Sequence, residues 1–171
     1  PFIVATVSGS GNTLTTAPDC SNMKIATFTG PGTFCVSQGG TACGSNTVDY
    51  LVVAGGGGGG SGCGAGGAGG AGGMRFSFPN PSTGGLPVSA QAYPITVGAG
   101  GTKGDGSVAP GCLPTRSGSK GSDSIFSTKT STGGGLGGAG TGSNKPGGAG
   151  GSGGAGGRGA SPGNGNTPPV S

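Results

Sequence analysis

The chain has 171 residues, of which 49 are glycine and 13 are proline, while 29% are hydrophobic and only 7% are charged. This length suits one domain or two small ones, and the apolar content is too thin for an ordinary hydrophobic core. The net charge of +4 comes from scattered basic residues, and no apolar run reaches about 18 residues, so we expect neither a nucleic-acid partner nor membrane insertion.

The N-terminal region, residues 1–54, is predicted to be rich in β-strands. Residues 2–7 (FIVATV) combine β-branched and aromatic side chains, which strands favour. Residues 24–29 and 33–36 flank the sequence Gly-Pro-Gly, so we expect them to pair as a hairpin. Residues 48–54 (VDYLVVA) form the clearest strand, and because both of its faces are mostly apolar, we expect it in the centre of a sheet.

Two glycine-rich blocks, residues 54–74 and 133–162, follow a three-residue rhythm. In the first block Ala65, Ala68, Ala71 and Met74 recur every third residue, and glycine fills nearly every position between them. In the second block the recurring residues are Leu136 and Ala139, then Ala149, Ser152, Ala155, Arg158 and Ser161. This period is neither that of an α-helix nor that of a strand. It is the period of a threefold, left-handed helix of the polyproline II type, which has no internal hydrogen bonds.

A polyglycine II-like sandwich over residues 55–163 is the structure that we predict from this rhythm. Collagen does not fit, because two of every three residues are glycine and proline is nearly missing from the runs. A threefold helix has three edges. In a bundle, a Gly-Gly-X helix can bury its two glycine edges against neighbouring helices and expose the side chains on the third. The all-glycine run 55–60 could be surrounded by neighbouring helices on every side. The backbone donors must then bond to adjacent helices or water. A flexible or poorly ordered tract, as in a matrix or cell-wall protein, is the alternative.

The remaining segments add short strands. Residues 93–97 (YPITV) are expected at a sheet edge because Pro94 lacks an N–H group, and residues 125–130 form a last strand. Residues 164–171 read as a polar tail. No segment has helical periodicity, so the predicted fold class is all-β plus polyglycine II with almost no α-helix.

The cysteines number five, which are Cys20, Cys35, Cys43, Cys63 and Cys112. Cys35 and Cys43 flank a turn-like segment, so a disulfide could close a hairpin there, and Cys63 and Cys112 could pin the first glycine block to the next segment. The odd number leaves one thiol free or paired between chains. Disulfides would indicate an oxidising, extracellular setting, whereas small buried thiols are the alternative.

Catalytic chemistry has few candidate residues. Histidine is missing, as is glutamate, and the acids are Asp19, Asp49, Asp105 and Asp123. No catalytic triad, carboxylate pair or metal cluster can be assembled from this set. We therefore expect a protein that is not an enzyme and that uses no metal or other cofactor.

Four ordered motifs carry a resemblance to a known family. They are KIATFTGPGTFCV (24–36), VDYLVVAGGGGGG (48–60), YPITVGAGG (93–101) and SDSIFSTKTSTGGG (122–135). In this order they resemble the glycine-rich domain of bacteriophage tail-fibre and virion proteins, over about residues 24–158. The combination is specific, whereas glycine runs alone would not be. The five cysteines depart from the family pattern.

The resemblance implies a structural or display protein outside the cell or on a virion. In the tail-tip adhesins of this family, polyglycine II helices pack in a layered sandwich and the loops between them contact the host receptor. Partners would then be copies of the chain, other fibre proteins, or a host-surface receptor or glycan. By this reading the exposed loop contacts are Phe76, Phe78, Asn80, Lys103 and Arg116.

A secreted subunit that assembles into an extracellular filament is the alternative function. The β-prone segment with Phe2, Ile3, Val4 and Val7 could complete the sheet of a neighbouring copy by strand addition, and flat glycine-rich faces could add further contacts. Pairing of this segment within its own chain is the competing interpretation.

Overall fold

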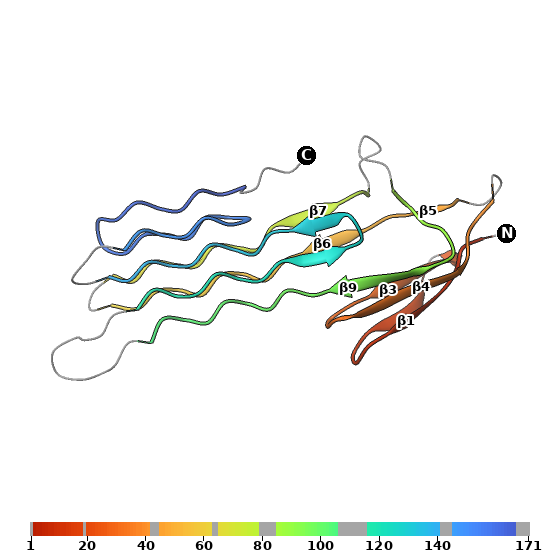
Figure 1. Ribbon diagram of the computed structural model, residues 1–171, viewed down its shortest axis with the longest axis horizontal. Helices are drawn as coiled ribbons and strands as arrows, with labels where there is room; N and C mark the ends of the chain where they lie inside the picture. Colours follow the sequence, from red (N-terminus) through yellow and green to blue (C-terminus); the bar gives the residue numbers. More distant parts are fainter. Residues whose placement is uncertain are drawn as a thin grey trace. The chain divides into compact units, whose positions relative to one another are not determined.

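The computed structural model describes residues 2–18, 20–41, 45–62, 65–78, 85–105, 116–140 and 145–166 (Figure 1). Strands occur in these ranges up to Ser131 and helices in none of them, which confirms the predicted all-β class without helix for the described part. Correspondingly, no helix in the same ranges is long and apolar enough to cross a membrane.

The chain divides into two compact units, each built from three stretches of sequence. The β unit contains Pro1–Val52, Arg75–Val97 and Ile125–Lys129. The glycine unit contains Val53–Met74, Gly98–Ser124 and Thr130–Ser171. The sequence prediction divided the chain into consecutive regions. In the structure, the chain crosses from one unit to the other several times.

The largest sheet has five strands in the order β1-β4-β9-β10-β11. Their bounds are β1 (Val4–Ser8), β4 (Gly32–Gln38), β9 (Ala92–Thr96), β10 (Ser124–Phe126) and β11 (Lys129–Ser131). β4 pairs antiparallel with both β1 and β9, and β9 pairs antiparallel with β10. β1 is therefore an edge strand of this sheet.

Three two-stranded ribbons complete the strands. They are β2 (Thr13–Ala17) with β3 (Cys20–Thr27), β5 (Thr47–Val48) with β8 (Leu86–Pro87), and β6 (Leu51–Val53) with β7 (Met74–Phe76). The predicted central strand 48–54 is thus wrong, because it is divided between β5 and β6 and both lie in two-stranded ribbons. Ser77 marks the break: its hydroxyl donates to Asp49 at 2.8 Å and accepts from the Tyr50 N–H at 3.0 Å.

The predicted hairpin around Gly-Pro-Gly is also wrong, since its two strands belong to different sheets. β3 pairs with β2, and β4 pairs with β1. Asn12 holds the connection: its side-chain oxygen accepts from the N–H groups of Thr29 (3.0 Å) and Gly30 (3.2 Å). Its amide nitrogen donates to the carbonyl oxygens of Ser8 (2.9 Å) and Pro31 (3.4 Å).

The prediction that Pro94 marks a sheet edge is wrong as well, because β9 lies between β4 and β10. Pro94 is opposite Thr33 of β4, but the ladder with β10 involves only Ile95 and Thr96 of β9. Proline is tolerated in this interior strand because, among the described strands, only one neighbour reaches its position.

Three aromatic rings form the centre of the β unit's core. Phe34 lies 6.4 Å from Tyr93 and 6.1 Å from Phe126 between ring centroids, and Tyr93 lies 6.2 Å from Phe126. Tilted and edge-to-face pairs at these separations stabilise a core beyond the area that they bury. The buried Tyr93 hydroxyl accepts from the Ser89 N–H at 2.8 Å, so its polar group is satisfied. The other buried members of this core are Val36, Val52, Leu86 and Val88.

Candidate functional site

The glycine unit is held together by backbone hydrogen bonds between extended segments (Figure 1). Gly57 and Gly60 donate to carbonyl oxygens of segment 65–73, each at 2.8 Å, whereas Gly58 donates to Ser119 at 2.9 Å. Donors three residues apart therefore reach the same neighbouring segment, and the next donor reaches a different one. In a β-sheet the donors that reach one neighbour recur at every second residue, so this three-residue repeat is not that of a β-sheet.

Segment 132–140 shows how many neighbours one segment can have. Its N–H and C=O groups bond to five other segments, which are 54–62, 65–73, 116–123, 145–151 and 151–158. For example, Gly134 donates to Gly55 and Gly135 donates to Ser152, both at 2.9 Å. We call this network of segments the glycine array. Its backbone groups are satisfied between segments, as buried polar groups must be.

Close approach of these backbones explains why glycine is required within the array. A Cβ atom on Gly57 would overlap the carbonyl oxygen of Gly135, and one on Gly58 would overlap that of Thr102. At Gly56 and Gly59 the nearest atom would lie 3.6 Å away, an ordinary van der Waals distance. The prediction that the run 55–60 is surrounded on every side is therefore wrong at Gly56 and Gly59, where a Cβ atom would fit.

The prediction that a Gly-Gly-X segment buries two edges and shows the third is confirmed in segment 65–73. A Cβ on Gly66 or Gly69 would overlap segment 54–62, and one on Gly67 or Gly70 would overlap segment 151–158. The residues on the third edge are exposed, and they are Ala65, Ala68 and Ala71. The same holds for Ala149, Ser152, Ala155, Arg158 and Ser161.

Ala139 departs from this rule, because it is only 2% exposed although it carries a side chain, and Leu136, three residues before it, is half-buried. Ala139 belongs to segment 132–140, and its N–H donates to the Ser117 hydroxyl at 3.3 Å. The expectation that every side chain needs an outward edge is wrong here. A methyl group is the smallest side chain, and only that volume has to be accommodated.

The predicted loop contacts are divided between the two units. Phe78 is 71% exposed, and Phe76 is 40% exposed but lies in β7 rather than in a loop. Lys103 and Arg116 are exposed residues of the glycine unit. Asn80 lies outside the described residues.

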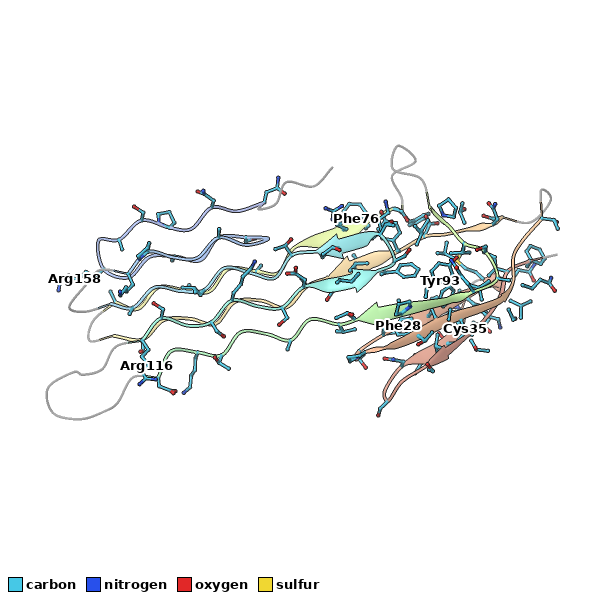
Figure 2. The ribbon with its side chains drawn as sticks, in the orientation of Figure 1. Phe28, Cys35, Phe76, Tyr93, Arg116 and Arg158 are labelled. Atoms are coloured by element: carbon cyan, nitrogen blue, oxygen red, sulfur yellow. The ribbon has the colours of Figure 1, made fainter. Side chains whose placement is uncertain are left out.

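Arg116 is anchored by its backbone. Ser61 N–H donates to the Arg116 carbonyl oxygen at 2.9 Å, and the Arg116 N–H donates to the Ser61 hydroxyl at 3.1 Å. This pair fixes the Arg116 main chain at one end of the array, while its side chain is exposed (Figure 2).

Cys35 is a free thiol on the exposed face of β4. Its strand neighbours are Thr6 and Ala92. The predicted disulfide between Cys35 and Cys43 is therefore not formed in this structure, because β4 places residue 35 within a sheet rather than at the start of a closed hairpin. Cys43, Cys63 and Cys112 lie outside the described residues, as does the side chain of Cys20.

The N-terminal segment pairs within its own chain. Val4 lies opposite Gln38 and Val7 opposite Phe34, with a bulge after Val4. Ile3 and Val7 pack against the core of the β unit. Phe2 is 64% exposed and Val4 is 50% exposed, and β1 has a paired strand on one side only among the described strands. β1 is thus an edge strand among the described strands.

The described carboxylates that form hydrogen bonds have structural partners. Asp49 accepts from the Ser77 hydroxyl, and Asp123 accepts from the Gly133 N–H, both at 2.8 Å. In the described part of the chain, no three Cys, Asp, Glu or His side chains gather where a metal ion could be held.

A family comparison places these observations in context. A family model described as a glycine-rich domain matches residues 27–169. The chain belongs to this glycine-rich domain family. The matched part of the domain includes both glycine blocks and the strands β4 to β11. Neither the curated proteins nor the solved structures that were searched gave a match.

Sequence reasoning did not select Lys145 and Arg158 as contact residues, although both are exposed. Lys145 begins one glycine segment and Arg158 ends another. Lys103 and Arg116, which were selected, also lie at the boundary of a glycine segment. A basic residue at such a boundary is therefore the sequence signal that could have identified Lys145 and Arg158.

Proposed function

We propose that this glycine-rich domain is a non-catalytic structural and display protein of an extracellular or virion fibre, and that its extended segments are polyglycine II helices. The observation that carries the proposal is the hydrogen bonding of the glycine array. Donors recur at three-residue intervals, and segment 132–140 bonds to five neighbours. A threefold helix without internal hydrogen bonds accounts for both features.

Such an array is suited to a rigid scaffold. Each backbone hydrogen bond stabilises a fold by about 1 kcal/mol net, and the array forms them in several directions around one segment. Glycine loses more conformational entropy on ordering than other residues, so the bonds must act together to hold it. Regions with buried, hydrogen-bonded backbone open rarely, which would protect an exposed fibre from proteases.

Display would use the exposed side chains at the boundaries of the glycine segments and in the β unit. Phe78, Phe76, Lys103 and Arg116 are exposed, and exposed aromatic and arginine residues are common anchors of binding surfaces. A host-surface receptor or glycan is the partner that we propose for them. The sequence supplies no histidine and no glutamate, which supports a role without catalysis.

Immunogold electron microscopy of the particles and secreted material of the producing cells tests the location. We expect label along extracellular or virion fibres. Label confined to the cell interior would contradict the proposal.

A cell-binding assay tests display. The variant Phe76→Ala/Phe78→Ala/Lys103→Ala/Arg116→Ala should lose binding to host cells. The control variant Met23→Ala/Ile25→Ala removes two other exposed apolar side chains from β3 and should bind normally. Equal binding by both variants would remove the display role and leave only the structural one.

A secreted, self-assembling filament subunit is the second candidate function, and the position of β1 at the edge of the described five-stranded sheet supports it. Strand addition at this edge would pair β1 with a strand of another copy. Val4→Lys places a charge on the edge, which opposes edge-to-edge pairing. Val4 is half exposed, so the fold should tolerate the change.

Electron microscopy of the isolated chain without reductant tests this alternative. We expect filaments from the unaltered chain and none from the Val4→Lys variant or from a chain that lacks residues 1–7. Filaments formed equally well by the Val4→Lys variant would rule out strand addition, and discrete particles from the unaltered chain would rule out the filament.

A further inference from the structure

The positive charge of the glycine unit is concentrated at one end of its array. The unit contains five basic residues, which are Lys103, Arg116, Lys120, Lys145 and Arg158. Four of them, all but Lys120, lie toward the end of the array where Ser61 bonds to Arg116. We call these four residues the basic end.

Backbone hydrogen bonds establish this placement. Ser61 bonds to Arg116 at 2.9 Å and accepts from Gly140 at 3.1 Å. Arg158 N–H donates to the Ala65 carbonyl oxygen at 3.2 Å, and Gly157 N–H donates to that of Lys145 at 3.0 Å. Gly104, next to Lys103, donates to Gly59 at 2.7 Å. Figure 2 shows Arg116 and Arg158 at the same end of the glycine unit.

The charge at this end is unbalanced. All four basic side chains are exposed, and none forms an ion pair with a described residue. Asp105 is the single acidic residue beside them. The sequences between these described segments, 63–64, 106–115 and 141–144, contain no charged residue. Four positive charges therefore face one negative charge.

The chemistry of the surrounding surface restricts the partner. The sequence of the glycine unit contains no Phe, Tyr or Trp, so it has no aromatic ring on which bases of single-stranded nucleic acid could stack. Among the described residues, the exposed edges next to the basic end carry alanine and serine, which lack the large apolar side chains that insert into a membrane interface. The surface at the basic end thus offers exposed positive charges and hydroxyl groups, and these groups suit binding of a hydrated polyanion.

We infer that the basic end docks an acidic polysaccharide, a polymer that carries repeated carboxylate or sulfate groups. The inference rests on the proposed display function and gives the chemical class of the partner. The four cations would contact successive anionic groups along the polymer.

Binding of the full chain to immobilised polygalacturonate tests the inference, with neutral dextran as the reference polymer. Each exposed cation near an anionic surface contributes about a fivefold change in affinity. We therefore expect the variant Arg116→Gln/Arg158→Gln to bind about tenfold to thirtyfold more weakly. The control Lys24→Gln/Lys129→Gln removes the same net charge from the β unit and should change affinity less than about twofold. Binding of the unaltered chain should also weaken steeply between about 0.05 M and about 0.2 M salt.

Equal losses in the two variants would overturn the inference, because the effect would follow net charge rather than position. Equally strong binding to dextran would overturn it too, as would stronger binding to duplex DNA or to anionic lipid vesicles. If the chain fails to bind polygalacturonate but still binds host cells, the inference is wrong and the display function stands. If it binds neither, both fail.

Discussion

At the scale of the residue, glycine is required in the array by space and not by backbone angle. Positive φ values among the described glycines occur at Gly9, Gly11 and Gly159, which lie outside the run 55–60. Every residue type could therefore adopt the backbone of this run. What excludes other residues is the carbonyl oxygen of a neighbouring segment at the position of Cβ.

This distinction predicts opposite outcomes for adjacent substitutions. Gly57→Ala places a methyl group on the Gly135 carbonyl oxygen and should destabilise the fold by about 3 kcal/mol or more, as overpacking does. Gly56→Ala has ordinary van der Waals room and should change stability by less than about 1 kcal/mol, with a gain expected from the stiffer unfolded chain. Thermal or denaturant unfolding measures both.

The matched pair Gly60→Ala and Gly59→Ala should repeat this contrast one triplet along, because a Cβ on Gly60 would overlap the Gly138 carbonyl oxygen. If all four alanine variants are equally stable, the close approach of the segments is refuted.

At the scale of the element, strand pairing was less predictable than the glycine rhythm. The rhythm is local, because period and side-chain size can be read from consecutive residues. The expected hairpin failed because Asn12, far away in sequence, bonds to Thr29, Gly30 and Pro31 and separates β3 from β4. The strand 48–54 failed for a similar reason, because Ser77 bonds to Asp49 and Tyr50.

Asn12→Ala tests the role of this side chain. It leaves four hydrogen-bonding backbone groups without their partner, so we expect a loss of about 2–3 kcal/mol at about 1 kcal/mol or less per bond. Asn22→Ala, at an exposed position of β3, is the control and should cost less than about 0.5 kcal/mol. Denaturant unfolding would contradict the assignment if the two variants lost the same stability.

The candidate site was predicted only in part, because local features can be read from the sequence whereas contacts between distant segments cannot. Exposure of Phe78, Lys103 and Arg116 follows from their local sequence. The gathering of Lys145 and Arg158 with Arg116 depends on the register of segments distant along the chain, fixed by bonds such as Arg158 to Ala65. Sequence period alone does not determine that register.

At the scale of the whole molecule, two kinds of order coexist in one chain. The β unit has a compact core around Phe34, Tyr93 and Phe126. The glycine unit has no aromatic residue in its sequence, and its order depends on backbone hydrogen bonds and close packing. Its stability therefore depends less on apolar burial than that of an ordinary domain.

Amide hydrogen exchange resolved by residue tests this account most directly. In segment 54–62 the N–H groups of residues 54, 55, 57, 58, 60 and 61 donate to neighbouring segments. Those of Gly56 and Gly59 have no acceptor among the described residues. We predict slow exchange at the first set and fast exchange at Gly56 and Gly59, a pattern that repeats every third residue. Fast exchange throughout the run, or protection that alternates with a period of two, would contradict the threefold array.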